Sequence, residues 1–91
     1  MHFVYILLSL KDWKFYIGYT TDLDERIKKH NQGGVKSTST RLPMKLIFYE
    51  AYLNKYDALR RERYFKSTPG RKTLKIMLRE TLFEIKNNIN S

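Results

Sequence analysis

Cysteine is absent from the sequence, so neither a disulfide nor a thiolate metal site contributes to its fold. Nothing in the composition therefore points to an oxidising compartment. No apolar run approaches the length that crosses a membrane. The apolar N-terminal stretch alternates with tyrosines and lacks the basic region and cleavage site of a signal peptide. We expect a cytoplasmic protein without a membrane partner.

Acidic residues are also few, because 9 Asp and Glu stand against 18 Lys and Arg, which gives a net charge of +9. Such an excess predicts a polyanionic partner, most simply nucleic acid; the alternative is a generically basic, solvated surface. The sequence has no glycine-rich phosphate loop and no Ser-His-Asp pattern. It also has no repeat and no linker, so we expect a single domain over residues 1–86 with a frayed tail at residues 87–91.

The apolar segments predict an α+β protein with the element order β-β-α-β-α-α. Two short apolar runs flank a polar turn and predict a hairpin. Both are apolar on both faces, so helices are expected to cover both sides of the sheet. Gly18 within the second run indicates close backbone approach, a bulge or a ligand. The predicted strands are residues 3–8, 15–20 and 45–52.

Helices are predicted after Asp22 and after Asn54, since each residue is a suitable N-cap. Asp22 is followed three residues later by Glu25, as in a capping box. A last helix is predicted from about residue 70 to residue 86. Its inward stripe is expected to be Leu74, Met77, Leu78, Leu82 and Ile85.

Glu62 falls in the middle of the apolar stripe that Ala58, Leu59 and Phe65 form on the second predicted helix. A buried carboxylate is costly unless it is paired or bound to a metal. Two interpretations therefore stay open. One is an ion pair with Arg26 or another arginine, and the other is a ligand for a hard divalent cation.

Four further polar residues are candidates for catalysis, each with a structural alternative. Arg26 either pairs with Glu62, lies along the apolar stripe or holds a phosphate in a bidentate fork. His30, one helical turn later, is either structural or a proton-transfer group. Tyr5 and Tyr16 are either core rings or hydroxyls that act on a water. Together these groups suit phosphodiester hydrolysis, in which a metal and an arginine offset phosphate charge while a hydroxyl orients or deprotonates water.

A basic loop of hydroxyl residues follows the first helix. It is suited to contact a phosphate, although most loops of this composition are merely solvated. The candidate nucleic-acid contacts are Lys36, Ser37, Thr38, Arg41, Arg61 and Lys66.

The residues just described form motifs in a specific order. The first two read Val4-Tyr5-Ile6 and Tyr16-Ile17-Gly18. The later ones are Thr20, Leu23, Arg26, Ile27, His30, Asn31, Gly33-Gly34, Arg41-Leu42-Pro43 and the helix segment Ala58-Leu59-Arg60-Arg61-Glu62. In this respect the sequence resembles the GIY-YIG endonuclease domain family, and more closely its small stand-alone bacterial (UPF0213-like) members.

The resemblance implies a three-stranded antiparallel sheet with helices around it, and cleavage of DNA that depends on Mg²⁺ or Mn²⁺. By position, Tyr5 and Tyr16 match the motif tyrosines, Arg26 the phosphate-binding arginine and Glu62 the metal ligand. His30 matches a histidine of one family branch, and we expect Tyr5 to act as the base with His30 assisting.

The resulting expectation is an endonuclease, structure-selective in repair or recombination, that acts on DNA more readily than on RNA. The alternative is a nucleic-acid-binding module with little intrinsic cleavage. We expect a monomer or weak dimer, and the lack of a targeting domain leaves room for a targeting protein partner.

Overall fold

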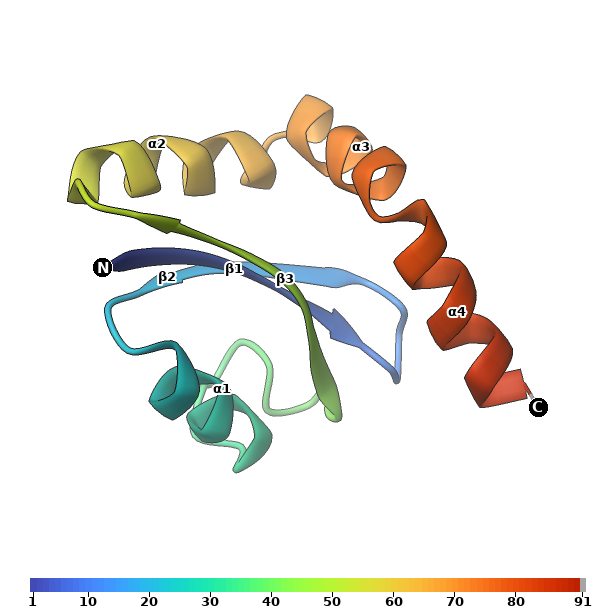
Figure 1. The fold of residues 1–91 in the computed structure, drawn as a ribbon. Coiled ribbons are helices and arrows are strands. Elements are labelled where there is room, and N and C mark those ends of the chain that lie inside the picture. Colours follow the sequence, from blue (N-terminus) through green and yellow to red (C-terminus); the bar gives the residue numbers. More distant parts are fainter. Residues whose placement is uncertain (91) are drawn as a thin grey trace.

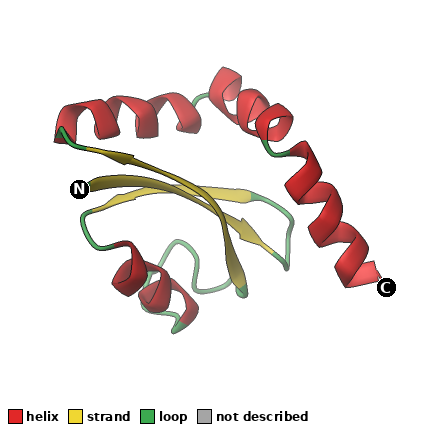
Figure 2. Cartoon of the chain, in the orientation of Figure 1, coloured by secondary structure: helices red, strands yellow, loops and turns green. Residues whose placement is uncertain are grey.

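The protein is described by a computed structural model, which covers the backbone of residues 1–90 and the side chains of residues 1–88. Three strands and four helices follow one another along the chain (Figures 1 and 2). They are β1 (His2–Ser9), β2 (Phe15–Thr20), α1 (Leu23–Asn31), β3 (Met44–Tyr52), α2 (Lys55–Lys66), α3 (Thr68–Met77) and α4 (Arg79–Asn90).

The three strands form one antiparallel sheet in the order β2-β1-β3, so β1 is the central strand. Tyr5 pairs with Gly18, and Leu7 pairs with Tyr16. Helix α1 covers one face of the sheet, and α2 lies across the other, followed by α3 and α4 (Figure 1). The predicted α+β class, the antiparallel sheet and the helical cover on both faces are therefore confirmed.

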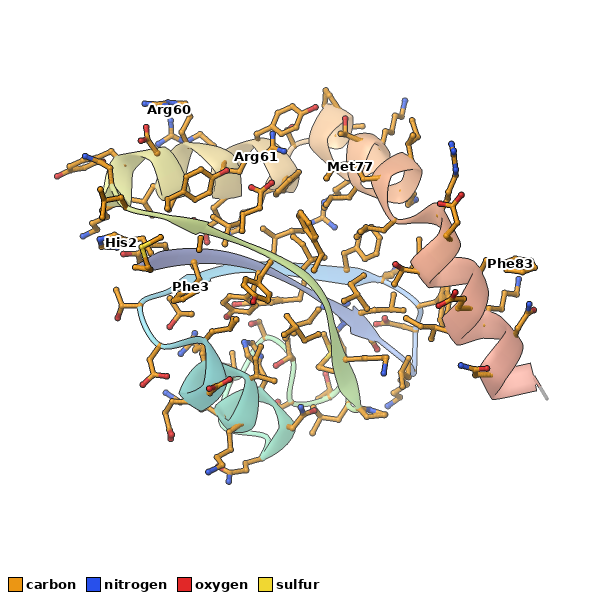
Figure 3. All side chains as sticks on the ribbon, viewed as in Figure 1. His2, Phe3, Arg60, Arg61, Met77 and Phe83 are labelled. Carbon is orange, nitrogen blue, oxygen red and sulfur yellow. The ribbon has the colours of Figure 1, made fainter. Side chains whose placement is uncertain are left out.

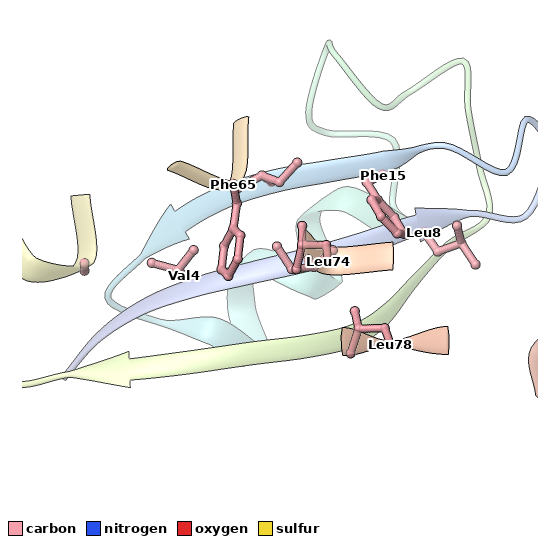
Figure 4. Packing of buried hydrophobic residues seen from close by; sticks show 9 residues of the cluster. Val4, Leu8, Phe15, Phe65, Leu74 and Leu78 are labelled. Atoms are coloured by element: carbon pink, nitrogen blue, oxygen red, sulfur yellow. The ribbon is translucent and has the colours of Figure 1, made fainter. Parts of the chain in front are cut away.

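Successive residues of β1 point into two separate cores, because side chains alternate across a strand. Val4, Ile6 and Leu8 pack toward the helices α2 to α4, where they meet Phe65 and Leu74 (Figure 4). Tyr5 and Leu7 point instead to the α1 side, where they cluster with Met44. The central strand is thus buried on both faces, as its uninterrupted apolar sequence indicated.

The predicted helix starts are confirmed in detail. The Asp22 side chain accepts a hydrogen bond from the backbone N–H of Glu25 at 3.2 Å. The Asn54 side chain accepts one from the N–H of Tyr56 at 2.8 Å. Each bond satisfies a backbone donor that has no partner within its own helix.

The C-terminal region differs from the prediction in three ways. The single helix expected at residues 70–86 is two helices, because Leu78 leaves the helical conformation (φ −109°, ψ 20°) while its side chain stays buried. Met77, predicted to face inward, is 42% exposed. Residues 87–90, expected to fray, continue α4, whereas residue 91 lies outside the described residues. Figure 1 shows α4 turning away from α3 after this break.

Candidate active site

Four of the five predicted catalytic residues meet on the α1 side of the sheet. Tyr5 projects from β1 and Tyr16 from β2, while Arg26 and His30 lie one turn apart on α1. The Tyr5 hydroxyl lies 2.9 Å from Nε2 of His30, and Arg26 Nε donates a hydrogen bond to the same hydroxyl at 3.3 Å. The Tyr16 and His30 rings stand edge to face with their centroids 4.9 Å apart.

Gly18 makes room for this arrangement. Tyr5 and Gly18 are partners in the β1–β2 register, and a Cβ atom added to Gly18 would overlap the Tyr5 ring and its hydroxyl. Any other residue at this position would displace the phenol. Gly18 was predicted to mark close backbone approach, a bulge or a ligand, whereas the group that approaches it is a tyrosine side chain.

The hydrogen bonds around His30 form a chain with a defined direction. The backbone carbonyl of Val35 is only an acceptor, so Thr38 gives its one hydroxyl hydrogen to it and must accept from His30. A neutral imidazole that donates through Nδ1 accepts at Nε2, which sets the direction at Tyr5. Arg26 donates to the Tyr5 oxygen, Tyr5 donates to His30 Nε2, and His30 Nδ1–H donates to Thr38 Oγ1 at 2.7 Å. Thr38 in turn donates to the Val35 carbonyl at 3.4 Å. The network thus assigns the Nδ1–H tautomer to His30 and leaves Nε2 as an acceptor.

Burial controls the protonation of this network. Desolvation raises the pKa of Tyr5 to about 12, with a further increase from neighbouring Tyr16 and an opposing effect of the Arg26 hydrogen bond. Desolvation also lowers the pKa of His30 to about 4, helped by the positive charges of Arg26 and Lys29. In the free protein, therefore, Tyr5 is a neutral phenol and His30 a neutral imidazole at physiological pH.

Thr38 has a different environment from the one predicted. Thr38 was predicted as a nucleic-acid contact, but it is fully buried and bonded to His30, so it is not available to a phosphate. Its loop begins beyond the end of α1 and brings Thr38 to the imidazole of His30. The sequence offered no periodic signal for this contact, because the loop is irregular.

Two further predicted nucleic-acid contacts are occupied by ion pairs. Arg41 binds Asp12 through Nε at 2.8 Å and also donates to the Lys14 carbonyl at 3.2 Å. Arg61 binds Glu50 through two nitrogens, at 2.9 and 3.2 Å, and its guanidinium lies 4.3 Å from the Phe65 ring centroid. The bidentate groups of both arginines therefore already have carboxylate partners within the protein.

The remaining candidates lie at the surface. Lys36 and Ser37 are exposed, and the Lys66 side chain is 53% exposed. These three stay predictions as nucleic-acid contacts.

Glu62 stands apart from the other four catalytic candidates. Its carboxylate is 19% exposed and pairs with Lys66 at 3.3 Å, so of the two interpretations left open, the ion pair with Arg26 or another arginine is not the one found. The hydrogen bonds and ion pairs recorded for residues 1–88 do not join Glu62 to the tyrosine–histidine network. Of the five candidate catalytic residues, four thus lie together and Glu62 lies apart.

The geometry of α2 nevertheless directs Glu62 to the edge of the sheet where β2 lies. Arg61, one residue earlier, turns toward β3, where it binds Glu50. Consecutive helical residues differ by about 100° around the axis, so Glu62 and Lys66 occupy the other flank of α2. Because the strand order is β2-β1-β3, that flank faces β2. Glu62 and Tyr16 therefore approach the same edge strand from opposite faces.

Comparison with known proteins places the chain in a family. A family model described as the GIY-YIG catalytic domain matches residues 1–75. The chain belongs to the GIY-YIG family. The two halves of the family motif lie on the paired strands β1 and β2, with Tyr5 opposite Gly18.

Relatives within the GIY-YIG family come from several bacteria. The UPF0213 protein YazA of Bacillus subtilis is 44% identical over 72 residues, which is 78% of this chain and 72% of the relative. A UPF0213 protein of Lactococcus lactis is 43% identical over 89 residues, covering 97% of this chain and 83% of the relative. The solution NMR structure of the UPF0213 protein BH0048 from Bacillus halodurans is 43% identical, covers 84% of this chain and 83% of the other, and has a TM-score of 0.53.

The donor atoms of this GIY-YIG domain fit a divalent metal only as a water-rich site. Among the residues that the structure describes, no three His, Cys, Asp or Glu side chains gather to hold an ion. Mg²⁺ is commonly held by one or two carboxylates, with water and substrate phosphate as the other ligands. The single carboxylate of Glu62 is enough for such a site, provided that the ion displaces Lys66 from it. None of the helices within residues 1–90 is long and apolar enough to span a bilayer.

Proposed function

We propose that the protein is a metal-dependent endonuclease that hydrolyses phosphodiester bonds of DNA in the cytoplasm, selecting branched structures that arise in repair or recombination. The observation that supports this most strongly is the directed chain from Arg26 through Tyr5 to His30. It joins a phosphate-binding cation, a phenol and a neutral imidazole, which is the set of groups needed to move a proton beside a phosphate.

The exposure of the two tyrosines divides their roles. Tyr16 is half-buried and takes a proton from the attacking water while its own hydroxyl proton passes to the neighbouring Tyr5 oxygen. Tyr5, which is fully buried, gives up its hydroxyl proton in the same relay. The proton ends on His30 Nε2, which already accepts the Tyr5 hydrogen bond. This refines the expectation that Tyr5 is the base with His30 assisting.

Substrate binding makes His30 a stronger base. The charge of Arg26 is one of the causes that lower the pKa of His30. A phosphate paired with Arg26 cancels part of that charge, so the pKa of His30 rises when DNA is bound. The same pairing leaves Arg26 able to stabilise the charge that develops on the phosphate.

Glu62 would hold Mg²⁺ or Mn²⁺ at the β2 edge, together with water and phosphate oxygens. The bound ion would supply charge compensation to the phosphate and its leaving group. The Glu62 carboxylate would fix the position of the ion, and its ion pair with Lys66 must break before the ion binds.

The test uses labelled flaps, forks, duplexes and matched RNA strands, each with Mg²⁺, with Mn²⁺ and with a chelator. We expect metal-dependent cleavage of branched DNA by the wild type and none by Glu62→Ala, whose circular dichroism and melting remain those of a folded protein. Glu84→Ala, on an exposed residue of α4, is the matched control and should cleave normally. Equal cleavage by Glu62→Ala would reject the proposed metal site.

A nucleic-acid-binding module without cleavage is the second candidate. The ion pair of Glu62 with Lys66 favours it, because this pair occupies the sole proposed metal ligand. The net charge of +9 predicts binding that weakens steeply with salt in either case. Steep salt dependence without cleavage of any substrate in the panel would favour the module.

A further inference from the structure

A hollow of about 400 Å³ opens beside the turn between β1 and β2, on the α3 side of the sheet. Its apolar wall includes Leu8 and Phe15, which are core residues. Its polar lining is entirely basic, because Lys14, Arg71 and Lys75 line it and no acidic residue does. The hollow therefore combines apolar surface with concentrated positive charge.

The three cations are available to an anion. Among the ion pairs of the described residues, none involves Lys14, Arg71 or Lys75. Arg71 Nε is 3.5 Å from the Lys66 carbonyl, which leaves the terminal nitrogens of the guanidinium unused. Unpaired cations around one hollow attract phosphate by simple Coulomb interaction.

Trp13 lies at the entrance of this hollow in an unusual conformation. It is the sole tryptophan of the chain, its side chain is 39% exposed, and its φ of 61° lies in the left-handed region. Large side chains rarely adopt that region, and such backbone persists only where its surroundings fix it. An exposed indole held in this way indicates a ring presented for contact.

The turn that presents Trp13 is tightly braced. The backbone N–H of Trp13 donates to the Ser9 carbonyl at 2.9 Å, and the Asp12 N–H donates to Ser9 Oγ at 3.1 Å. Asp12 Oδ1 accepts from the Lys14 N–H at 3.0 Å, while Arg41 clamps both Asp12 and the Lys14 carbonyl. The backbone that carries the indole is thus held in place before any ligand arrives, which lowers the entropic cost of binding.

From these observations we infer that the hollow binds an unpaired nucleotide of a nucleic-acid strand, with the base stacked on Trp13 and its phosphates near Lys14, Arg71 and Lys75. Proteins usually hold single strands with an aromatic side chain beside a basic groove. The bases of a duplex are stacked on one another, so they have no exposed ring face for Trp13 to contact. The inference rests on the proposed function and deepens it, because it specifies a substrate with a single-stranded portion. Phe15 in the hollow and Tyr16 in the candidate active site are consecutive on β2, so a strand crossing this edge reaches both.

Tryptophan fluorescence provides a direct test, because Trp13 supplies all of the indole signal. A short single-stranded oligothymidylate should quench the emission saturably, and a duplex of equal length should quench it much less. Weaker binding of thymidine monophosphate than of the oligonucleotide supports a strand site. Tighter binding of the mononucleotide would overturn it in favour of a free nucleotide.

Variants locate the contact by fluorescence anisotropy of a labelled single strand. Trp13→Gly suits the left-handed backbone and should weaken binding roughly five- to hundredfold, the usual effect of removing one base stack. Trp13→Phe, which keeps an aromatic face, should retain most of the affinity. Lys75→Gln should lower the slope of log affinity against log salt concentration by about one. Lys86→Gln, outside the hollow, should leave this slope unchanged. Unchanged affinity of Trp13→Gly would refute the inference.

The two proposals fail separately. Quenching by single strands without cleavage of any substrate rejects the nuclease and keeps the strand site. Metal-dependent cleavage without quenching keeps the nuclease and rejects the strand site.

Discussion

The hydroxyl of Tyr5 and Nε2 of His30 lie 2.9 Å apart across the interface between the central strand and α1, and both side chains are fully buried. Neither group is charged in the free protein, because burial raises the pKa of the phenol and lowers that of the imidazole. Under the proposed function, this pair stays neutral until a phosphate pairs with Arg26.

The first prediction concerns the effect of pH on stability. Burial lowers the pKa of His30 to about 4, well below its ordinary value of 6.5. Between these values the unfolded state binds the extra proton, so stability rises with pH through this window and is fully present above it. We expect the contribution of His30 to change by up to about 3 kcal/mol across the window. Urea unfolding of the wild type and of His30→Gln, which hydrogen bonds without titrating, measures it; parallel pH curves would contradict the assignment.

The second prediction concerns the space at Gly18. Gly18→Ala places a methyl group against the Tyr5 ring, so we expect a loss of ~1–3 kcal/mol of stability and of all cleavage activity. The cause can be isolated with a double-mutant cycle. In a Tyr5→Ala background the clash is absent, and Gly18→Ala should cost much less. An equal cost in both backgrounds would show that the tyrosine ring is not the obstacle.

The third prediction concerns the brace of the hairpin turn. The hydrogen bond from Arg41 holds the pKa of Asp12 at about 2, well below its ordinary value of 3.8. The lowered value means that the pair persists at ordinary pH and is lost only as the pH falls toward 2. In Arg41→Ala the Asp12 carboxyl should titrate near its ordinary value, as followed by NMR, and the fluorescence of neighbouring Trp13 should change. The fold should persist in this variant, because both partners lie at the surface.

The fourth prediction concerns the metal requirement. Lys66→Gln removes the cation that competes for the Glu62 carboxylate, so half-maximal cleavage should need roughly two- to fivefold less Mg²⁺. Arg60→Gln is the matched control, since Arg60 lies on the same helix, pairs with Asp57 and points away from the sheet (Figure 3). An unchanged requirement in Lys66→Gln would argue against Glu62 as the ligand.

The features that the sequence could predict are those set by neighbours along the chain. Strand alternation and helix caps depend on residues within a few positions, and the caps at Asp22 and Asn54 were predicted for that reason. The helix break at Leu78 was missed because neither glycine nor proline marks it. The partners of Thr38 and Arg41 were missed because both contacts close irregular loops, for which the sequence carries no period.

In the candidate site, too, the sequence predicted the local arrangement but not the contacts that depend on the path of the chain. Helical spacing correctly placed Arg26 and His30 on one side of α1, near the two tyrosines. It could not reveal which face of the sheet α2 would cover, because that depends on how the chain returns after β3. Glu62 thus approaches from the far face, with Lys66 as its partner.

The pairing of Tyr5 with Gly18 also protects the hairpin from misalignment. If β2 shifted by one residue along β1, Ile17 or Tyr19 would stand opposite Tyr5 in place of Gly18. Their side chains would occupy the space that the Tyr5 ring needs. Gly18 thereby selects the strand register sterically. Only the register that brings Tyr5, Arg26 and His30 together avoids a clash between β2 and the phenol. Correct strand pairing and the assembly of the Tyr5–His30 network consequently depend on the same glycine.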